Sequence, residues 1–251
     1  MPTAIHFNTH MLRCSMKPSI SNWLSAISII AAAGFADFAE SAESKPSNAE
    51  TAVVWNIDNL KSIGGHAVTV VGAPRVVESA DNAEGAVKAV EFDGKQDGLF
   101  VAANPLAGLT TFTVEVVFRP TAGGPAAQRF LHFQPEGTEE RLLFETRLIE
   151  GSRWFLDTYL LFGGGSQTLF AKDFPHPIDR WYAAAITIDG DVMRHFVDGK
   201  EEMTTKIVPP KLGAGQTSIG VRFNKVHWYQ GAIRTIRVTP RVLKPEEMLK
   251  P

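Results

Sequence analysis

The sequence predicts an all-β domain, a two-sheet antiparallel jelly-roll sandwich, and three observations lead to this fold class. From Ala52 onward, short apolar runs alternate with Gly, Pro, Asn and Asp. Several runs have a two-residue period, and none has a sustained 3.6-residue period. Two Asp-Gly pairs interrupt neighbouring apolar runs, which is a strong hairpin signal. Many short strands with turn residues between them are typical of a sandwich.

The clearest strand is the run 112–119, FTVEVVFR. Phe112, Val114, Val116 and Phe118 alternate with Thr113, Glu115, Val117 and Arg119. The alternation predicts one face on a core and one face in water, and Pro120 ends the strand.

The runs 181–188 and 192–197 predict a hairpin, because Asp189-Gly190 separates them and type I′ turns favour Asp-Gly. Asp198-Gly199 then turns the chain toward a third strand. Both faces of the first run are apolar, so we expect it to be covered on both sides. His195 alternates with Met193 and Val197, which predicts a packed structural histidine and makes this hairpin part of the scaffold.

One short helix is expected at the C-terminal end, over 244–250. Pro245 suits a first helical position, and Glu246 and Glu247 suit the first turn.

The N-terminal region has the features of a cleaved targeting segment and not those of a folded domain. A lysine, an apolar stretch and small residues follow one another over 16–36, as in a secretory signal peptide, with Met11 or Met16 as alternative starts. A retained anchor is the alternative, although the apolar stretch is short for a membrane span. Residues 37–51 are polar and predict a flexible linker, which leaves 52–251 as the domain. We therefore expect a secreted, periplasmic or cell-surface protein.

Cysteine usage and charge restrict the function. Cys14 is the only cysteine, so the predicted domain has no disulfide or cysteine-ligated metal. The formal net charge is −2 for the whole chain, and no basic cluster stands out, which argues against nucleic acid as a partner. No segment after residue 36 resembles a membrane span.

Five motifs together resemble bacterial laminin G-like domains of the concanavalin A-like jelly-roll superfamily: AVEFDGKQDGLFV (89–101), FTVEVVFRP (112–120), RWYAAAITIDGDVMRHFVDGK (180–200), TSIGVRF (217–223) and GAIRTIRVTPRVLKPEEM (231–248). The resemblance covers about residues 52–250. It implies two packed antiparallel sheets and binding of glycans or proteins at the cell surface.

The chain departs from this family at two motifs. Its Trp-His-His segment is here Trp181-Tyr182-Ala183, and its acidic pair is here Arg234-Thr235. Some relatives bind calcium, and the loss of the acidic pair removes the family's usual support for that cofactor. A calcium site that uses the turn acids Asp93 or Asp97 stays open as an alternative, although the sequence does not indicate one.

The first candidate site is a polar sheet face formed by the runs 129–134, 141–149 and 154–162. Pairing of these runs would gather His132, Glu145, Arg147, Asp157 and Tyr159. Cross-strand ion pairing on a solvated face is one interpretation. A saccharide-binding patch is another, because charged groups and aromatic rings suit sugar hydroxyls and C–H faces. A catalytic patch is the third.

The catalytic interpretation is a polysaccharide lyase acting by β-elimination. Tyr159 or His132 would remove a proton, and Arg147 would neutralise a uronate carboxylate. Glycosidase activity is disfavoured, because no strand carries the closely spaced acids that this reaction needs.

The second candidate site is the loop 221–231, VRFNKVHWYQG, with the polar and aromatic residues Arg222, Asn224, His227, Trp228 and Tyr229. Loops at the end of a sandwich commonly bind ligands, and exposed aromatic rings stack on sugars. Alternatively, Trp228 and Tyr229 close the end of the core.

The sequence contains no HExxH, GxSxG or Walker motif and no Cys/His metal spacing. We therefore expect a binding domain without catalytic activity whose partner is a carbohydrate or surface polymer. A jelly-roll polysaccharide lyase and a structural or protein-interaction module of the envelope are the alternatives.

Overall fold

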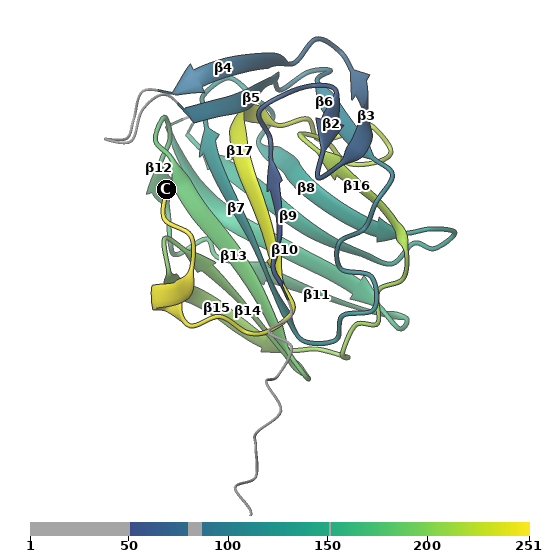
Figure 1. The fold of residues 1–251 in the computed structure, drawn as a ribbon. Coiled ribbons are helices and arrows are strands. Elements are labelled where there is room, and N and C mark those ends of the chain that lie inside the picture. The colour runs from purple at the N-terminus through teal and green to yellow at the C-terminus, as the bar shows by residue number, and fades with distance from the viewer. Residues whose placement is uncertain (1–50, 80–86, 151) are drawn as a thin grey trace, which may run out of the picture. The chain divides into compact units, whose positions relative to one another are not determined.

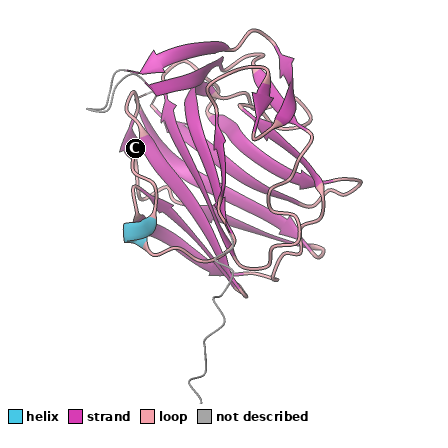
Figure 2. Ribbon diagram, in the orientation of Figure 1, coloured by secondary structure: helices cyan, strands magenta, loops and turns pink. Residues whose placement is uncertain are grey.

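The computed structural model describes residues 51–79, 87–150 and 152–251 (Figure 1). The predicted signal peptide and, apart from Thr51, the predicted linker lie outside the described residues. The described part contains seventeen β-strands and one 3₁₀ turn, and the strands form two antiparallel sheets (Figure 2). The predicted all-β jelly-roll sandwich is therefore confirmed.

Sheet I lies in front in Figure 1. Its strand order is β15 (Lys200–Lys206), β14 (Val192–Val197), β13 (Tyr182–Asp189), β7 (Phe112–Pro120), β17 (Gln230–Thr239), β5 (Val87–Asp93) and β4 (Arg75–Ser79), with β1 (Val53–Asn56) also paired to β17.

Sheet II lies behind sheet I. Its strand order is β11 (Gly165–Phe170), β10 (Arg153–Phe162), β9 (Arg141–Ile149), β8 (Ala127–Pro135), β16 (Gly215–Ile219), β6 (Gly98–Val101), β3 (His66–Val71) and β2 (Ser62–Ile63), with β12 (His176–Pro177) paired to β10.

The core fills the space between the two sheets. The four apolar residues of β7 that alternation assigned to a core, Phe112, Val114, Val116 and Phe118, are each fully buried, as predicted. From sheet II, Phe130 stacks on Phe118 with ring centroids 4.5 Å apart, and Trp154 meets Phe118 edge-on at 5.1 Å. Complete burial of one such side chain contributes about 2–3 kcal/mol to folding, so this row is a large part of the driving force.

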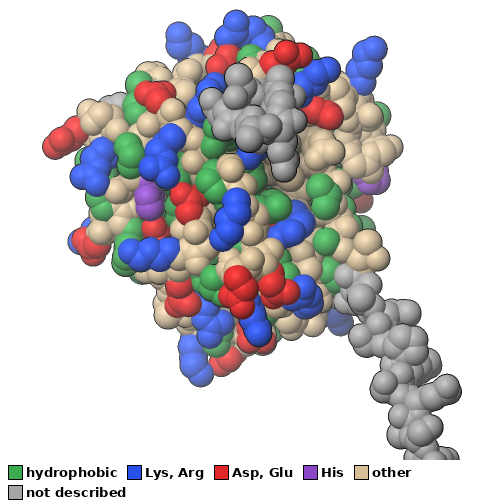
Figure 3. Space-filling model, turned by 60° about the vertical axis from the view of Figure 1, so that its left-hand side comes forward, with side chains coloured by type: hydrophobic (Ala, Val, Ile, Leu, Met, Phe, Trp, Pro, Cys, Tyr) green, Lys and Arg blue, Asp and Glu red, His purple; other side chains and the backbone are tan. Residues whose placement is uncertain are grey.

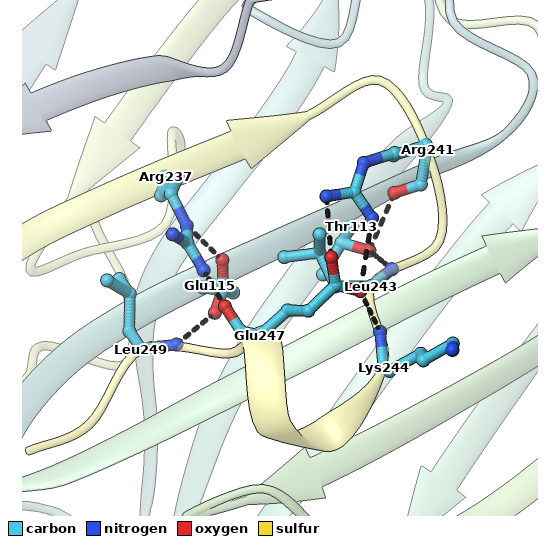
Figure 4. A network of polar contacts seen from close by, with 8 residues as sticks. All are labelled: Thr113, Glu115, Arg237, Arg241, Leu243, Lys244, Glu247 and Leu249. Carbon is cyan, nitrogen blue, oxygen red and sulfur yellow. Dashed lines mark hydrogen bonds and ion pairs between the residues drawn. The ribbon is translucent and has the colours of Figure 1, made fainter. Parts of the chain in front are cut away.

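The prediction that the opposite face of β7 is exposed to water is wrong for three of its four residues, and Arg119 alone is partly exposed. Thr113, Glu115 and Val117 are at most 2% exposed, because the C-terminal tail, residues 240–251, lies over sheet I. The hydroxyl of Thr113 donates to the carbonyl of Arg241 at 2.8 Å and accepts from the N–H of Leu243 at 2.9 Å (Figure 4).

Glu115 holds the end of the tail. Its Oε1 accepts from the N–H of Leu249 at 2.6 Å, and its Oε2 pairs with Nε of Arg237 (Figure 4). The alternating pattern correctly predicts that Glu115 faces away from the core. It contains no information about the distant segment that covers this face.

The tail also explains why β13 is apolar on both faces. Leu243 and Met248 pack on Ala185 and Phe196, which lie on the outer side of sheet I. The second cover of this strand is therefore the tail. The expected helix over 244–250 is a 3₁₀ turn, Pro245–Glu247, whose start is fixed by the N–H of Lys244 donating to Oε2 of Glu247 at 2.9 Å.

The Asp-Gly pairs at 189–190 and 198–199 make different turns. Asp198 and Gly199 both have positive φ, 51° and 76°, as a type I′ turn requires. In the β13–β14 hairpin, Asp189 pairs with Val192, so Gly190 and Asp191 form the turn and only Gly190 has positive φ. A glycine at the first central position is the type II′ requirement, so the predicted type I′ turn at Asp189-Gly190 is wrong.

His195 lies in the interior between the sheets, fully buried. Its Nδ1 is 3.1 Å from Oγ1 of Thr158 on β10, and its Nε2 is 3.9 Å from Oε2 of Glu202 on β15. Oε1 of Glu202 continues this polar chain to Nε2 of His176 at 2.8 Å. Burial lowers the pKa of His195 to about 3, so the ring is neutral at physiological pH.

Two surface properties complete the fold. On the side where the C-terminus lies, Lys and Arg side chains are interspersed with Asp and Glu, and no field of one sign is visible (Figure 3). In the part of the chain that the structure describes, no helix has the length and apolar character needed to cross a membrane.

Candidate functional site

The outward side of sheet II, called here the open face, carries the first group of predicted residues. Strands β9 and β10 pair so that Glu145 lies directly opposite Asp157. Arg147 and Tyr159 are two residues from this pair on their own strands and share its side of the sheet. On β8, His132 pairs with Leu143 and lies on the same side. The predicted grouping of these five residues on one face is thus present in the structure.

An ion network occupies the middle of the open face. Oδ2 of Asp157 accepts from Nε of Arg147 at 2.7 Å and lies 2.6 Å from its Nη2. Oε2 of Glu145 accepts from Nη2 of Arg147 at 3.1 Å and lies 3.0 Å from Nη2 of Arg129. Both acids are buried, at 2% and 1% exposure, although each lies on an outward side of the sheet.

Burial changes the protonation of these acids. It raises the pKa of Glu145 to about 7, and the neighbouring Asp157 carboxylate adds to the rise, while Arg129 and Arg147 oppose it. Burial also raises the pKa of Asp157, against the effect of Arg147. Two carboxylates opposite each other in a poorly solvated position disfavour double ionisation. The network therefore gains positive charge as the pH falls below 7.

Aromatic rings flank the network and are stacked with its arginines. Cζ of Arg141 lies 5.1 Å from the centre of the Tyr159 ring, and Cζ of Arg147 lies 5.6 Å from that of Phe170. Phe170 is on the edge strand β11, opposite Asp157, and is 44% exposed. Phe155 supports it edge-on, with ring centroids 4.7 Å apart. Such exposed, braced rings are suited to stack on an apolar sugar face.

His132 lies at the other side of the open face and is 1% exposed. The ring of Phe223 covers it at a centroid distance of 4.6 Å, and the N–H of Phe223 donates to its Nδ1 at 3.3 Å. Burial lowers the pKa of His132 to about 3, helped by the nearby cations Arg222 and Arg141. Its ring is therefore neutral, and acceptance at Nδ1 leaves the proton on Nε2.

Arg129 belongs to the site although strict alternation excludes it. In an uninterrupted strand, residues 129 and 132 point to opposite sides. The β8–β9 register shifts between Arg129 and Leu131, and this bulge brings Arg129 to the side of His132. Nothing in the run RFLHFQ marks a bulge. The sequence patterns also did not identify Arg141, Phe170 and Phe223 as residues of this face. Of these three, only Arg141 could have been found, because it alternates in the run 141–149 on the same side as Glu145 and Arg147.

The residues of the second candidate group, the predicted loop 221–231, do not lie together on one surface; its last two residues belong to β17. Arg222 is half-buried, Asn224 and His227 are exposed, and Trp228 is half-buried. The carbonyl of His227 accepts from the N–H of Arg129 at 2.9 Å, which joins the loop to the open face. Tyr229 is fully buried and packs on Phe92 and Phe130, so it cannot form a ligand platform with Trp228. For Tyr229, the alternative of closing the core is correct.

Asp93 and Asp97, two acids at turns, accept hydrogen bonds from the backbone. Oδ1 of Asp93 accepts from the N–H groups of Lys95, Gln96 and Asp97, and Oδ1 of Asp97 accepts from the N–H of Ala73 at 2.7 Å. Among the described residues, no group of three or more His, Cys, Asp or Glu side chains is arranged to hold a metal ion.

The class of protein follows from the sandwich and from a match to a family model. The Laminin_G_3 model, described as the concanavalin A-like lectin/glucanases superfamily, matches residues 93–248, more than half of the chain. The chain belongs to this superfamily. A comparison with curated protein sequences found no match.

Solved structures with the same fold include proteins that bind glycans. Domain 4 of AbnA, a GH43 extracellular arabinanase from Geobacillus stearothermophilus solved with arabinotriose, matches with a TM-score of 0.58 and 15% identity, over 78% of this chain and 94% of that domain. The binding domain of botulinum neurotoxin serotype D has a TM-score of 0.54 and 11% identity. A botulinum neurotoxin type C structure, described as dependent on two ganglioside molecules for cell entry, has a TM-score of 0.54 and 9% identity. The chain spans about half the length of these two toxin structures. At such identities the likeness establishes the fold alone.

Proposed function

We propose that the protein is a carbohydrate-recognition domain without catalytic activity, acting outside the cytoplasm, and that its ligand lies on the open face of sheet II. The observation that carries this proposal is the pairing of exposed or half-exposed aromatic rings with a rigid polar floor. Tyr159 and Phe170 are each stacked by an arginine, and both border Asp157 of the Glu145–Arg147–Asp157 network.

This arrangement suits a sugar for physical reasons. Sugars offer hydroxyl groups to charged side chains and C–H faces to aromatic rings, and a pre-organised site loses little conformational entropy on binding. Two proteins of the same fold are described with arabinotriose and with gangliosides, which is consistent with a glycan ligand.

The contacts favour recognition over β-elimination. A lyase would need Tyr159 or His132 free to take a proton. Here Arg141 stacks on Tyr159, and Phe223 covers His132.

The test is retention on a polymer panel of arabinan, dextran, polygalacturonate and dextran sulfate, measured with the wild type and with Phe170→Ala. We expect Phe170→Ala to weaken binding to a retained polymer about five- to tenfold, the worth of one stacked ring. Val76→Ala is the matched control, because Val76 is 41% exposed on β4 of sheet I.

Absence of retention on every polymer, or equal retention by Phe170→Ala and the wild type, would contradict the proposal. Ultraviolet absorbance of new unsaturated sugar ends in the same samples would favour the lyase instead.

A further inference from the structure

The balance of charge on the open face differs from that of the whole chain. The outward positions of β8, β9 and β10 carry two acids, Glu145 and Asp157, and four arginines, Arg129, Arg141, Arg147 and Arg153. The outward positions of β6, β11 and β16 carry no charged side chain. The chain as a whole has a formal net charge of −2, so this excess of positive charge is local.

The two acids repel an approaching anion only weakly. Each is at most 2% exposed and is already paired with arginine, so its charge is neutralised within the network. Arg147 is the most exposed member, with 28% of its side chain accessible. Within the network, a ligand therefore meets a guanidinium group before it meets a carboxylate, while Arg141 at the edge of the face has the exposed Glu139 3.7 Å away.

Arg222 adds a cation that has no acidic partner among the described residues. It lies in the loop after β16, close enough to His132 and His227 to lower the pKa of both. It is half-buried, and within the described ranges no hydrogen bond or ion pair holds its guanidinium. An arginine in this situation retains its full capacity for bidentate binding of a carboxylate or sulfate.

The neutral His132 completes the same region. Its Nδ1 is occupied by the N–H of Phe223, and its Nε2 makes no hydrogen bond to a described residue although it is buried. Arg141 on β9 and Arg222 in the loop are both close enough to this ring to lower its pKa, and Phe223, the residue after Arg222, packs on it. These contacts place the guanidinium groups of Arg141 and Arg222 in the same region of the open face.

We infer that the open face selects anionic polysaccharides, those bearing carboxylate or sulfate groups, and that Arg222 is a residue that determines this specificity. The inference rests on the proposed carbohydrate recognition and narrows it to a chemical class. Aromatic stacking by Tyr159 and Phe170 supplies contact with the sugar ring, and the arginines supply the choice between charged and neutral polymers.

The experiment compares polymers that differ in charge alone. Polygalacturonate is set against its methyl-esterified form, and dextran sulfate against dextran, with affinities measured at low and at physiological salt. We expect at least tenfold tighter binding of the charged member of one or both pairs, and weaker binding as salt rises. A preference in the first pair alone assigns carboxylate, and a preference in the second pair alone assigns sulfate.

Variants locate the effect. Arg222→Gln should lower affinity for the preferred charged polymer about tenfold, and Arg222→Lys should lose less because the charge remains. Arg194→Gln is the matched control, since Arg194 is a partly exposed arginine on the outward side of sheet I. An unchanged thermal midpoint in each variant shows that the fold is retained.

Three results would overturn the inference. Equal binding of charged and neutral members would leave carbohydrate recognition standing and remove the selectivity. Equal losses in Arg222→Gln and Arg194→Gln would assign the preference to overall charge. Failure to bind any polymer would remove both the inference and the proposed function.

Discussion

The two outer faces of the sandwich each bury a glutamate, but they bury it in different ways. On sheet I, both carboxylate oxygens of Glu115 have a partner, Arg237 for one and the N–H of Leu249 for the other. On sheet II, both arginine contacts of Glu145 go to the same oxygen, Oε2. The chain itself completes the first face with its C-terminal tail. The second face is covered at His132 by Phe223 of the loop, but no segment of the described residues is shown over Glu145, and the stacked ring of Phe170 lies at its edge.

This difference distinguishes a buried polar group that stabilises the fold from one that is available to bind a ligand. A buried charge whose partners are all supplied by the chain holds two segments together. Buried charges with shifted pKa values are enriched at functional sites. We therefore assign structure to the Glu115 region and propose binding for the Glu145 region.

The largest expected effect is on the covered face. Glu115→Ala leaves Arg237 and the N–H of Leu249 without their buried acceptor, and removal of one partner from a buried pair costs about 3–5 kcal/mol. The free energy of unfolding from urea titration measures this loss. Glu246→Ala, at an exposed position of the same tail, should change it by less than about 0.5 kcal/mol. A loss below about 1 kcal/mol for Glu115→Ala would show that this contact does not hold the tail.

The next effect concerns the interior histidine. The pKa of His195 is about 3 in the folded state, below its unfolded value, so its stabilising contribution is present above pH 6.5 and is lost as the pH falls toward 3. The slope is up to about 1.4 kcal/mol per pH unit. His195→Gln should flatten the decline of stability between pH 6 and 4. His66→Gln, at an exposed position, should leave the wild-type slope, and equal slopes in all three proteins would contradict the account.

Glu145 should act in the opposite direction. Its folded pKa of about 7 lies above its unfolded value near 4.5, so its contribution is present at low pH and is lost as the pH rises from about 4.5 to about 7. Glu145→Gln should remove this fall, about 1 kcal/mol per pH unit once sharing of the proton with Asp157 is allowed for. Denaturation midpoints from pH 5 to pH 8 measure it. A Glu145→Gln slope equal to that of the wild type would remove the distinction between the two faces.

The smallest effect is expected for an exposed ion pair. Nζ of Lys206 lies 3.0 Å from Oδ2 of Asp191, and the two side chains are 83% and 54% exposed. Lys206→Ala should therefore cost less than about 0.5 kcal/mol, because solvent and salt screen such pairs. A cost above about 1 kcal/mol would mean that ion pairing alone, without burial, accounts for the Glu115 result.

Much of the fold could be predicted because it depends on local patterns. The alternation in 112–119 identified which side chains of β7 form the core, and the Asp198-Gly199 pair identified a type I′ turn. Pairing of the runs 141–149 and 154–162 followed from their lengths and the short loop between them, and it brought Glu145 and Asp157 together. These features need no knowledge of distant contacts.

The errors depend on contacts that local patterns do not contain. The cover over Thr113 and Glu115 comes from residues about 130 positions later in the chain. The inclusion of Arg129 in the site requires a bulge that neither its residue types nor its spacing indicate. The polar loop around Tyr229 suggests an exposed ring that stacks on a ligand, yet Tyr229 is buried and packs on the rings of Phe92 and Phe130.

The most direct test of ligand binding on the open face is amide chemical-shift mapping with trigalacturonate and with arabinotriose. We predict shifts confined to β8, β9, β10, β11 and the loop 221–229, with the residues around Arg147, Phe170 and Arg222 affected most. Shifts centred on the tail and the outward side of sheet I, or no shifts with either oligosaccharide, would contradict this prediction.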